Sequence, residues 1–423
     1  MTDAKTSRSP SRQDLDAAAT GVGLEVVFQP IVALPDGGTV GFEALARWAR
    51  LGAIPPGDVF AHASDTGRAA ELERRCIEAA IVGALHADLA PGSALFINCE
   101  ATTPYLSPSD SEILARGAER FQVVFEVTER RLLTHPPDLL RKVVALRGDG
   151  FAIALDDVGT DLNALALLDV LAPDVIKLDL ALVQSQPRYL QARTWAAVLA
   201  HHERAGAQVL AEGIETTEHL QRAFALGATL GQGFRFGRPG PLSSGATAHP
   251  PWPPIRTQEP CIDTGSPFDI VAGSSLIRRE RTDTVIALSR YLEQQALEAA
   301  DPPLVLTALQ RAEFFTGATI THHQRLAAHC PLVVVFARDI ADDLGSGIHG
   351  VRFALDDPLA DQWIVLALGA NNAAALVSRE VPGLEDTSSD RDRTFDVALV
   401  NDRALVTRVA RQLLSRMLTT ATH

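Results

Sequence analysis

The chain has 423 residues, of which 46% are apolar and 21% are charged, and its formal net charge is −14. This length allows two domains, and the composition is that of an ordinary globular protein. The negative charge argues against a protein that binds polymeric nucleic acid, and the sequence contains no uncharged apolar run of about 18 residues that would predict a membrane span.

Residues 1–22 are largely polar and lack the apolar core of a signal peptide, so we expect a disordered N-terminal tail. The four cysteines are scattered and form no CxxC pair, which argues against both a disulfide framework and a zinc site. We therefore expect a cytoplasmic protein.

Residues 23–242 alternate short apolar runs with amphipathic segments, including predicted helices at 72–89, 136–147 and 189–205. The predicted strands or strand ends lie at residues 24–32, 38–48, 94–100, 122–129, 151–159, 175–179, 207–215 and 231–237. A strand–helix alternation of this length favours a (β/α)8 barrel over a doubly wound sheet.

Residues 243–262 are rich in Pro, Ser and Thr and lack apolar periodicity, which predicts a linker. Residues 263–423 then form a smaller α/β unit that has room for antiparallel strand pairs. We expect helices in the latter part of 274–300 and at 404–418. The predicted strands of this unit lie at residues 332–340, 350–357, 362–370, 373–380 and 395–402.

Acidic and amide side chains gather at the ends of the apolar runs in the first unit. Asp156 and Asp157 end one run directly, although an isolated Asp pair after a strand commonly caps a helix or forms a turn. The other runs end in side chains of similar chemistry, together with one lysine: Glu43, Asn98, Glu126, Glu129, Lys177, Asp179, Glu212, Glu215 and Gln232. Any one of them could be a solvated strand end.

Together, these side chains predict a hard, oxygen-rich site of the kind that binds Mg²⁺ or Mn²⁺. A carboxylate shared between two ions is typical of two-metal phosphoester chemistry. In that chemistry, the ions polarise a phosphoryl oxygen and lower the pKa of a bridging water to make hydroxide.

Seven motifs resemble, in order, those of the EAL-domain cyclic-di-GMP phosphodiesterases: FEALAR, FIN, EVTE, DDVG, IKLD, AEGIE and GQGF. The resemblance covers residues 24–242. It implies a TIM-like barrel with one antiparallel strand, and hydrolysis of cyclic di-GMP to linear pGpG with two Mg²⁺ or Mn²⁺ ions.

The resemblance also implies roles for single residues. The first metal's ligands would be Glu43, Asn98, Glu126 and Asp156, and Asp156 would bridge to a second ion that Asp157 also holds. Lys177 would position and help to activate the water, and Glu212 and Gln232 would complete the catalytic shell. Glu129 would brace the loop after Asp157, whereas Glu215 would be mainly structural. Arg47 would contact substrate phosphate, and Gln29 and Asp179 would face a guanine.

The loop after the Asp pair departs from the family pattern of a phenylalanine followed by Gly-Thr-Gly-Tyr-Ser-Ser. Val158 replaces the aromatic residue, and Gly159-Thr160 is followed by the sequence DLNA. In the family this loop supports the second metal and a homodimer contact. We expect an active enzyme because every expected ligand is present. A weak or inactive cyclic-di-GMP receptor and a phosphoesterase for another nucleotide remain alternatives.

Residues 263–423 contain no catalytic pair or phosphate-binding loop, and their pattern resembles the DICT domain, a sensory module. The resemblance implies regulation of the barrel by an unknown signal, and a dimerisation or docking module is the alternative. A second Asp pair at 356–357 precedes a proline, which predicts a turn. His322 and His329 have no evident carboxylate partner, and we expect His201 and His202 at the surface.

Overall fold

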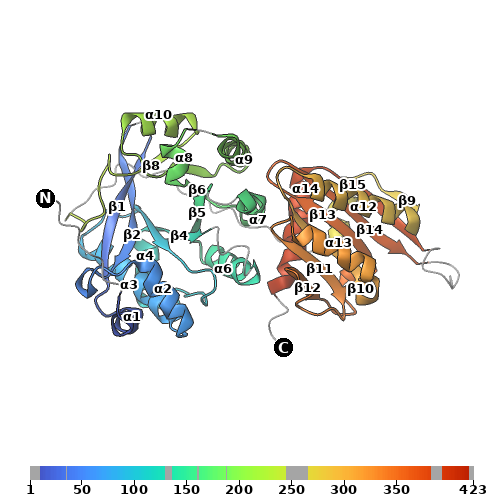
Figure 1. The fold of residues 1–423 in the computed structure, drawn as a ribbon, viewed down its shortest axis with the longest axis horizontal. Helices are drawn as coiled ribbons and strands as arrows, with labels where there is room; N and C mark the ends of the chain where they lie inside the picture. The colour runs from blue at the N-terminus through green and yellow to red at the C-terminus, as the bar shows by residue number, and fades with distance from the viewer. Residues whose placement is uncertain are drawn as a thin grey trace.

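The structure is a computed structural model of the chain and describes residues 10–34, 36–128, 136–159, 162–186, 188–243, 265–382 and 393–418. Figure 1 shows a barrel formed by the N-terminal part and a separate sheet with its helices formed by the C-terminal part. None of the helices in these ranges is long and apolar enough to cross a membrane.

Eight strands close into a barrel, in which β1 is antiparallel to both of its neighbours, β2 and β8. The other neighbouring pairs are parallel. This confirms the predicted TIM-like barrel with one antiparallel strand. The strands are β1 (Glu25–Ala33), β2 (Thr39–Arg47), β3 (Ala94–Asn98), β4 (Gln122–Thr128), β5 (Ala152–Val158), β6 (Val175–Leu178), β7 (Gln208–Ala211) and β8 (Leu230–Gln232).

Helices cover the outside of the barrel, as the strand–helix alternation predicts. They are α1 (Arg12–Ala19), α2 (Pro56–Asp65), α3 (Ala69–His86), α4 (Glu112–Arg120), α6 (Pro136–Gly148), α7 (Leu168–Leu171), α8 (Leu180–Gln184), α9 (Tyr189–Ala205) and α10 (Thr217–Ala225), with the 3-10 segments η1 (Ala49–Leu51) and η2 (Leu162–Leu167).

Helix α1 differs from the expected disordered tail at residues 1–22. Ser11 caps it, because its side chain accepts a hydrogen bond from the backbone N–H of Asp14 at 3.2 Å. Ala18 and Ala19 are fully buried in a cluster with Trp48. The polar sequence obscures this helix because its two fully buried residues are small, and Leu15 is its one large apolar residue packed against the cluster. Residues 1–9 lie outside the described ranges, as does nearly all of the expected linker at 243–262.

The C-terminal unit is a seven-stranded mixed sheet in the order β12-β11-β10-β13-β14-β15-β9. The pairs β10–β11 and β11–β12 are parallel and the other pairs are antiparallel. The strands are β9 (Arg278–Arg281), β10 (Leu304–Arg311), β11 (Val333–Arg338), β12 (Ile348–Arg352), β13 (Gln362–Leu368), β14 (Ala373–Val381) and β15 (Thr394–Val400). The sequence pattern did not predict β9 or β10.

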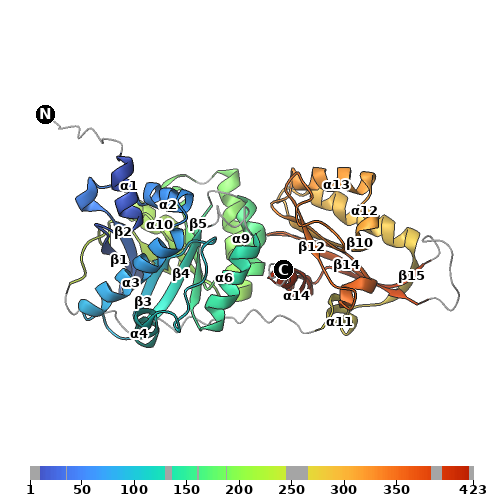
Figure 2. The same cartoon turned by 90° about the horizontal axis from the view of Figure 1, so that it is seen from below.

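Helices lie on both faces of this sheet, as Figure 2 shows: α12 and α13 on one face, and α11 and α14 on the other. Alternation along β13 produces the two cores, because Val365 packs with residues of α12 while Ile364 and Leu366 share a cluster with residues of α14. The helices are α11 (Pro267–Ala272), α12 (Thr282–Glu298), α13 (Gly317–Ala327) and α14 (Arg403–Ser415), with η3 (Ala312–Phe314), η4 (Pro358–Asp361) and η6 (Arg416–Leu418).

Asp169 of α7 joins the barrel to the second unit. Its carboxylate accepts hydrogen bonds from Arg403 of α14 and from Arg204, and its backbone carbonyl accepts one from Arg411 at 2.7 Å. His201 Nδ1 lies 2.8 Å from the same carboxylate. Burial alone would raise the pKa of Asp169, but the interactions with His201, Arg403 and Arg204 outweigh it and hold the pKa below its usual value. Helices α6, α7 and α9 therefore form the side of the barrel that faces the second unit (Figures 1 and 2).

Candidate active site

The predicted site residues continue the inward-facing rows of the barrel strands. The barrel interior is filled by apolar side chains that include Phe96, Val124, Ala154, Val175, Leu210 and Leu230. Side chains on a strand alternate between faces, so the residue two positions later faces the interior again. Those later residues are Asn98, Glu126, Asp156, Lys177, Glu212 and Gln232. The sequence thus brings them together at the C-terminal end of the barrel, the end at which TIM-barrel enzymes carry their active sites.

Lys177 is the centre of this cluster and is only 1% exposed. Its Nζ lies 2.7 Å from Glu126 Oε1, 3.0 Å from Asp156 Oδ1, 3.0 Å from Glu212 Oε1 and 3.7 Å from Glu43 Oε1. Burial alone would lower the pKa of Lys177, but these four carboxylates outweigh it and hold the pKa well above its usual value. Lys177 therefore stays charged and serves as the shared cation of the carboxylates.

The carboxylates around Lys177 have different proton affinities. Burial raises the pKa of Glu126 well above its ordinary value, and the neighbouring Glu43 carboxylate adds to the shift. Burial also raises the pKa of Glu212, to about 7, against the opposing effect of Lys177. For Glu43 the balance is reversed, because Lys177 and hydrogen bonds outweigh burial and lower its pKa. One ammonium does not neutralise this much buried negative charge.

Hydrogen bonds from two amide side chains fix the Glu43 carboxylate. Asn98 Nδ2 donates to Oε1 at 3.3 Å, and Gln232 Nε2 donates to Oε2 at 2.7 Å. Gln232 also donates to Gln29 Oε1 at 3.2 Å, and Gln29 donates in turn to the carbonyl of Gly237. These hydrogen bonds therefore link Asn98 of β3 and Glu43 of β2 to Gln232 of β8 and Gln29 of β1, where the barrel closes.

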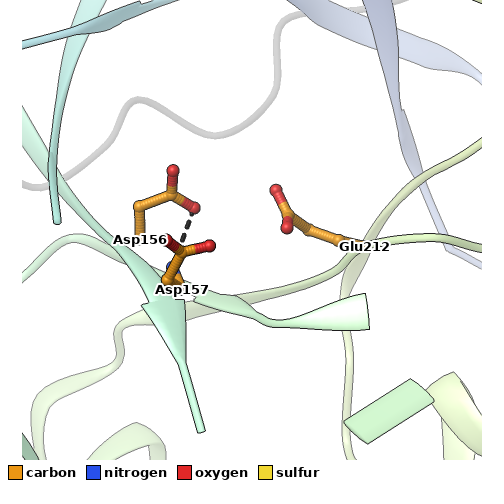
Figure 3. A group of neighbouring side chains, drawn as sticks. All are labelled: Asp156, Asp157 and Glu212. Atoms are coloured by element: carbon orange, nitrogen blue, oxygen red, sulfur yellow. Dashed lines mark hydrogen bonds between the residues drawn. The ribbon is translucent and has the colours of Figure 1, made fainter. Parts of the chain in front are cut away.

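Asp157 has a backbone conformation that few residues other than glycine adopt, with φ at +59°. Its N–H donates to Oδ1 of Asp156 at 3.0 Å, which is the dashed contact in Figure 3. Figure 3 also shows the Glu212 carboxylate approaching the Asp pair from the opposite side. Oxygens of Asp156, Asp157 and Glu212 all lie within 4.8 Å of one another, close enough to share a cation.

Gly233 gives Gln232 its place next to the end of β7. Its φ is +153°, and a Cβ atom here would collide with the backbone of Ile214. Only glycine therefore fits at position 233, where the backbone passes close to Ile214 in the loop after β7. The second glycine of the GQG sequence is thus explained by the close approach of two backbones.

A cavity of about 380 Å³ opens beside Glu43 and Asn98 and is lined by Arg47 at the end of β2. Arg47 is half-buried and donates to the carbonyl of Ala46 at 2.8 Å. Its guanidinium thus lies at the border between the carboxylate cluster and a space for a small molecule. Its expected contact with substrate phosphate stays a prediction.

Among the described residues, Asp179 and Glu215 do not join the central cluster. The side chain of Asp179 accepts a hydrogen bond from Ala181 N–H at 2.8 Å and caps α8. Its expected contact with a guanine stays a prediction. Glu129 lies outside the described ranges, as do Thr160 and Asp161 of the altered loop. Glu215 is exposed at the surface.

The sequence patterns did not reveal a buried ion pair that braces the site. Lys142 Nζ lies 2.8 Å from Glu73 Oε1 and also donates to the backbone carbonyl of Glu100 at 2.6 Å. The N–H of Glu100 donates to Glu73 at 2.7 Å. Both backbone groups of Glu100 are therefore fixed two residues after Asn98. The sequence offered one signal for this pair: Glu73 and Lys142 are charged residues on the inner faces of the predicted helices at 72–89 and 136–147.

The structure confirms some of the expectations for the histidines and the second Asp pair and contradicts others. His201 was wrongly expected at the surface: it is 2% exposed and contacts Asp169. His322 does have a carboxylate neighbour, Glu293 at 3.1 Å, which the sequence did not suggest because the two residues lie on different helices. His329 follows the end of α13 and does not share its face. The expected turn at 356–357 is confirmed, since Asp357 caps η4.

The cluster fits divalent cations. Four carboxylates surround one lysine and a fifth, that of Asp157, lies beside Asp156 and Glu212. Both oxygens of the fully buried Glu126 lack a well-aligned hydrogen bond. Carboxylate oxygens and the Asn98 amide oxygen are the donors that Mg²⁺ and Mn²⁺ prefer. Asp156, Asp157 and Glu212 form one group whose oxygens are close enough to hold an ion. The expected assignment of Glu43, Asn98, Glu126 and Asp156 to a first ion, and of Asp156 and Asp157 to a second, stays a prediction.

An acid-rich (β/α)8 barrel with one antiparallel strand defines the class of the N-terminal unit. Residues 12–239, more than half of the chain, match the EAL domain family, and the chain belongs to this family. Residues 278–381 match the family described as a sensory domain in diguanylate cyclases and two-component systems, DICT. Both predicted resemblances are thus confirmed.

Among similar proteins is the cyclic di-GMP phosphodiesterase RocR of Pseudomonas aeruginosa, 30% identical over 55% of this chain and 61% of its own length. Another is the probable cyclic di-GMP phosphodiesterase PdeG of Escherichia coli, 30% identical over 50% of this chain and 44% of its own length. The chain thus spans less than two thirds of either relative. A solved c-di-GMP complex of the PaMucR phosphodiesterase is 27% identical, with a TM-score of 0.47 over 54% of this chain and 96% of that one.

Proposed function

We propose that the barrel hydrolyses cyclic di-GMP to linear pGpG with Mg²⁺ or Mn²⁺ bound at the carboxylate cluster. The observation that carries the proposal is the convergence of Glu43, Glu126, Asp156 and Glu212 on one buried lysine, with Asp157 beside them. The names of the phosphodiesterase relatives support the choice of substrate. In the reaction, water adds across one phosphodiester bond and leaves a terminal phosphate and a free hydroxyl.

The side chains divide the work according to their positions. When bound, the divalent ions would activate a water and neutralise charge on the phosphate. Lys177, which is held by four carboxylates, orients that water, and Glu212 on its other side completes the shell. Gln232 and Asn98 keep the Glu43 carboxylate in one orientation. Arg47 contacts the substrate phosphate from the rim of the cavity, and Gln29 and Asp179 face a guanine.

We expect Glu43→Ala and Asp156→Asn each to reduce turnover of cyclic di-GMP to background, because each removes an anionic metal ligand. Circular dichroism and the melting temperature should show that both variants remain folded. Glu119→Gln removes a carboxylate from the exposed face of α4 and should leave turnover unchanged. Wild-type turnover in both site variants would refute the assigned metal ligands.

A receptor that binds cyclic di-GMP without hydrolysing it is the second candidate. It is favoured by the altered loop after Asp157, in which Val158 replaces the family's phenylalanine. This candidate predicts nucleotide binding with no pGpG in saturating Mn²⁺. A homodimer through this loop likewise stays a prediction.

We also propose that the second domain regulates the barrel through α7. The connection that begins at Asp157 leads through η2 into α7, where Asp169 contacts Arg403 and Arg411 of α14. A displacement of α14 would therefore act on the segment that supports the second group of metal ligands.

A further inference from the structure

The second domain contains a cavity of about 490 Å³ between α12 and α13, over β10 and β13. Figure 2 shows that α12 and α13 lie on the face of the sheet opposite α14, so the cavity lies on that face as well. This volume is within the range of about 300–1,000 Å³ that is usual for small-molecule sites. No described residue of the barrel lines this cavity.

Apolar and aromatic side chains form much of the cavity wall. They are Ile286 of α12, Leu309 of β10, Phe314 of η3 and Trp363 of β13. Leu309 is buried, and the other three are half-buried. A wall of this kind accommodates the apolar body of a small organic molecule.

Two ring nitrogens of lining residues are buried without a hydrogen-bond partner: Nε1 of Trp363 and Nε2 of His322. The indole N–H of Trp363 can only donate. His322 Nε2 lies 3.1 Å from Oε2 of Glu293, but not in hydrogen-bond geometry. Because a buried donor without an acceptor is costly, a ligand that brings an acceptor oxygen into the cavity gains affinity.

Two arginines at the cavity provide positive charge. Arg290 of α12 and Arg325 of α13 are exposed, and neither makes a hydrogen bond or an ion pair with another described residue. They nevertheless lie close enough to act electrostatically, since the pKa of His322 is lowered first by burial and then by Arg325 and Arg290. The cavity thus combines one unpaired donor, the Trp363 N–H, and two arginines with an apolar wall.

Glu293 is the one acidic residue among the described residues that line the cavity, and it is only 8% exposed. Burial raises its pKa to about 7, against the opposing effect of Arg290. Much of the Glu293 population is therefore uncharged near neutral pH, and the carboxyl does not cancel the two arginines.

We propose that this cavity binds a small organic carboxylate with an aromatic or branched apolar body. Arg290 and Arg325 hold the carboxylate, Trp363 donates a hydrogen bond to it, and the apolar body contacts Leu309 and Phe314. The proposal assigns a ligand class to the sensory domain and thereby deepens the proposed regulation. Binding is measured directly, so its outcome is independent of whether the barrel hydrolyses cyclic di-GMP.

The test is isothermal titration of the full chain with phenylacetate, cyclohexanecarboxylate and naphthoate, each at up to millimolar concentration. At least one should bind, and its uncharged amide (phenylacetamide for phenylacetate) should bind at least about tenfold more weakly, because it loses charge-assisted hydrogen bonds. Inorganic phosphate, an anion without an apolar body, should not compete.

Matched variants locate the binding. Arg290→Ala combined with Arg325→Ala should weaken binding by about tenfold or more, and Trp363→Phe, which keeps the ring but removes the donor, by several-fold. Ala318→Trp adds bulk from an exposed position at the cavity and should block it. Arg278→Ala removes the same charge from exposed β9, outside the cavity, and should bind as wild type does.

Melting temperatures without ligand would show that these variants remain folded. Failure of all three carboxylates to bind would overturn the proposal. Equal binding of the carboxylate and its amide, or wild-type affinity in Ala318→Trp and in the double arginine variant, would overturn it as well.

Discussion

At the scale of single residues, Lys177 is the cation that lets several carboxylates share a small buried volume. Without it, those carboxylates would repel one another unless they bound protons or metal ions. The same lysine therefore stabilises the metal-free barrel and leaves enough negative charge to bind divalent cations.

We expect Lys177→Met to lower the free energy of unfolding of the metal-free chain by roughly 3 kcal/mol, because it leaves buried charges unpaired. Added Mn²⁺ should then stabilise the variant more than it stabilises wild type. Lys142→Met breaks a different buried ion pair and is the matched control: it should destabilise without any greater response to Mn²⁺. An unchanged melting temperature for metal-free Lys177→Met would contradict this role.

Glu293 should make the stability of the second domain depend on pH. Its folded pKa of about 7 lies above its ordinary value of 4.5, so the folded state binds the proton more tightly. Its contribution to stability is fully present below the unfolded pKa and is lost as the pH rises through the folded pKa, a loss of roughly 3 kcal/mol. The charged and titratable groups facing it are Arg290 on its own helix, and His322 and Arg325 on α13.

Glu293→Gln should remove this dependence. Relative to wild type, the variant should gain stability between pH 5 and pH 8 by an amount on the order of 2 kcal/mol. Denaturant titrations of both proteins at the two pH values measure the difference, in which the contribution of His322 largely cancels. A difference that does not change with pH would show that Glu293 has an ordinary pKa.

At the scale of elements, the sequence predicted the barrel better than the contacts between its parts. Strand runs and the alternating rows that end in Asn98, Glu126 and Lys177 are local patterns, so they are visible along the chain. Helix α1 was missed because its buried side chains are alanines. Asp169 was missed because its partner Arg403 is 234 residues away and only the folded chain brings them together.

The contact between α7 and α14 should hold the two domains together. Arg403→Ala combined with Arg411→Ala removes two hydrogen bonds to Asp169 and should cost roughly 2 kcal/mol of docking free energy. Small-angle scattering should show a larger radius of gyration, and the turnover of cyclic di-GMP should change. Arg279→Ala breaks an exposed ion pair within the second domain and serves as the control. Unchanged scattering and turnover would argue against regulation through this contact.

At the scale of the whole molecule, the chain combines an EAL barrel with a DICT domain, and the two have opposite electrostatic needs. The barrel site gathers carboxylates that require cations, whereas the cavity of the second domain gathers donors and arginines that require an anion. The net charge of −14 does not indicate the charge of either site, because each site's charge depends on which side chains the fold brings together there.

Catalysis by the carboxylate cluster is best tested by measuring turnover of cyclic di-GMP by the purified full chain. The measurement is made with Mg²⁺, with Mn²⁺ and with a chelator. If the cluster is catalytic, pGpG should form with at least one metal and should not form with the chelator. Tight binding of cyclic di-GMP without any pGpG in saturating Mn²⁺ would contradict it and would identify the chain as a receptor.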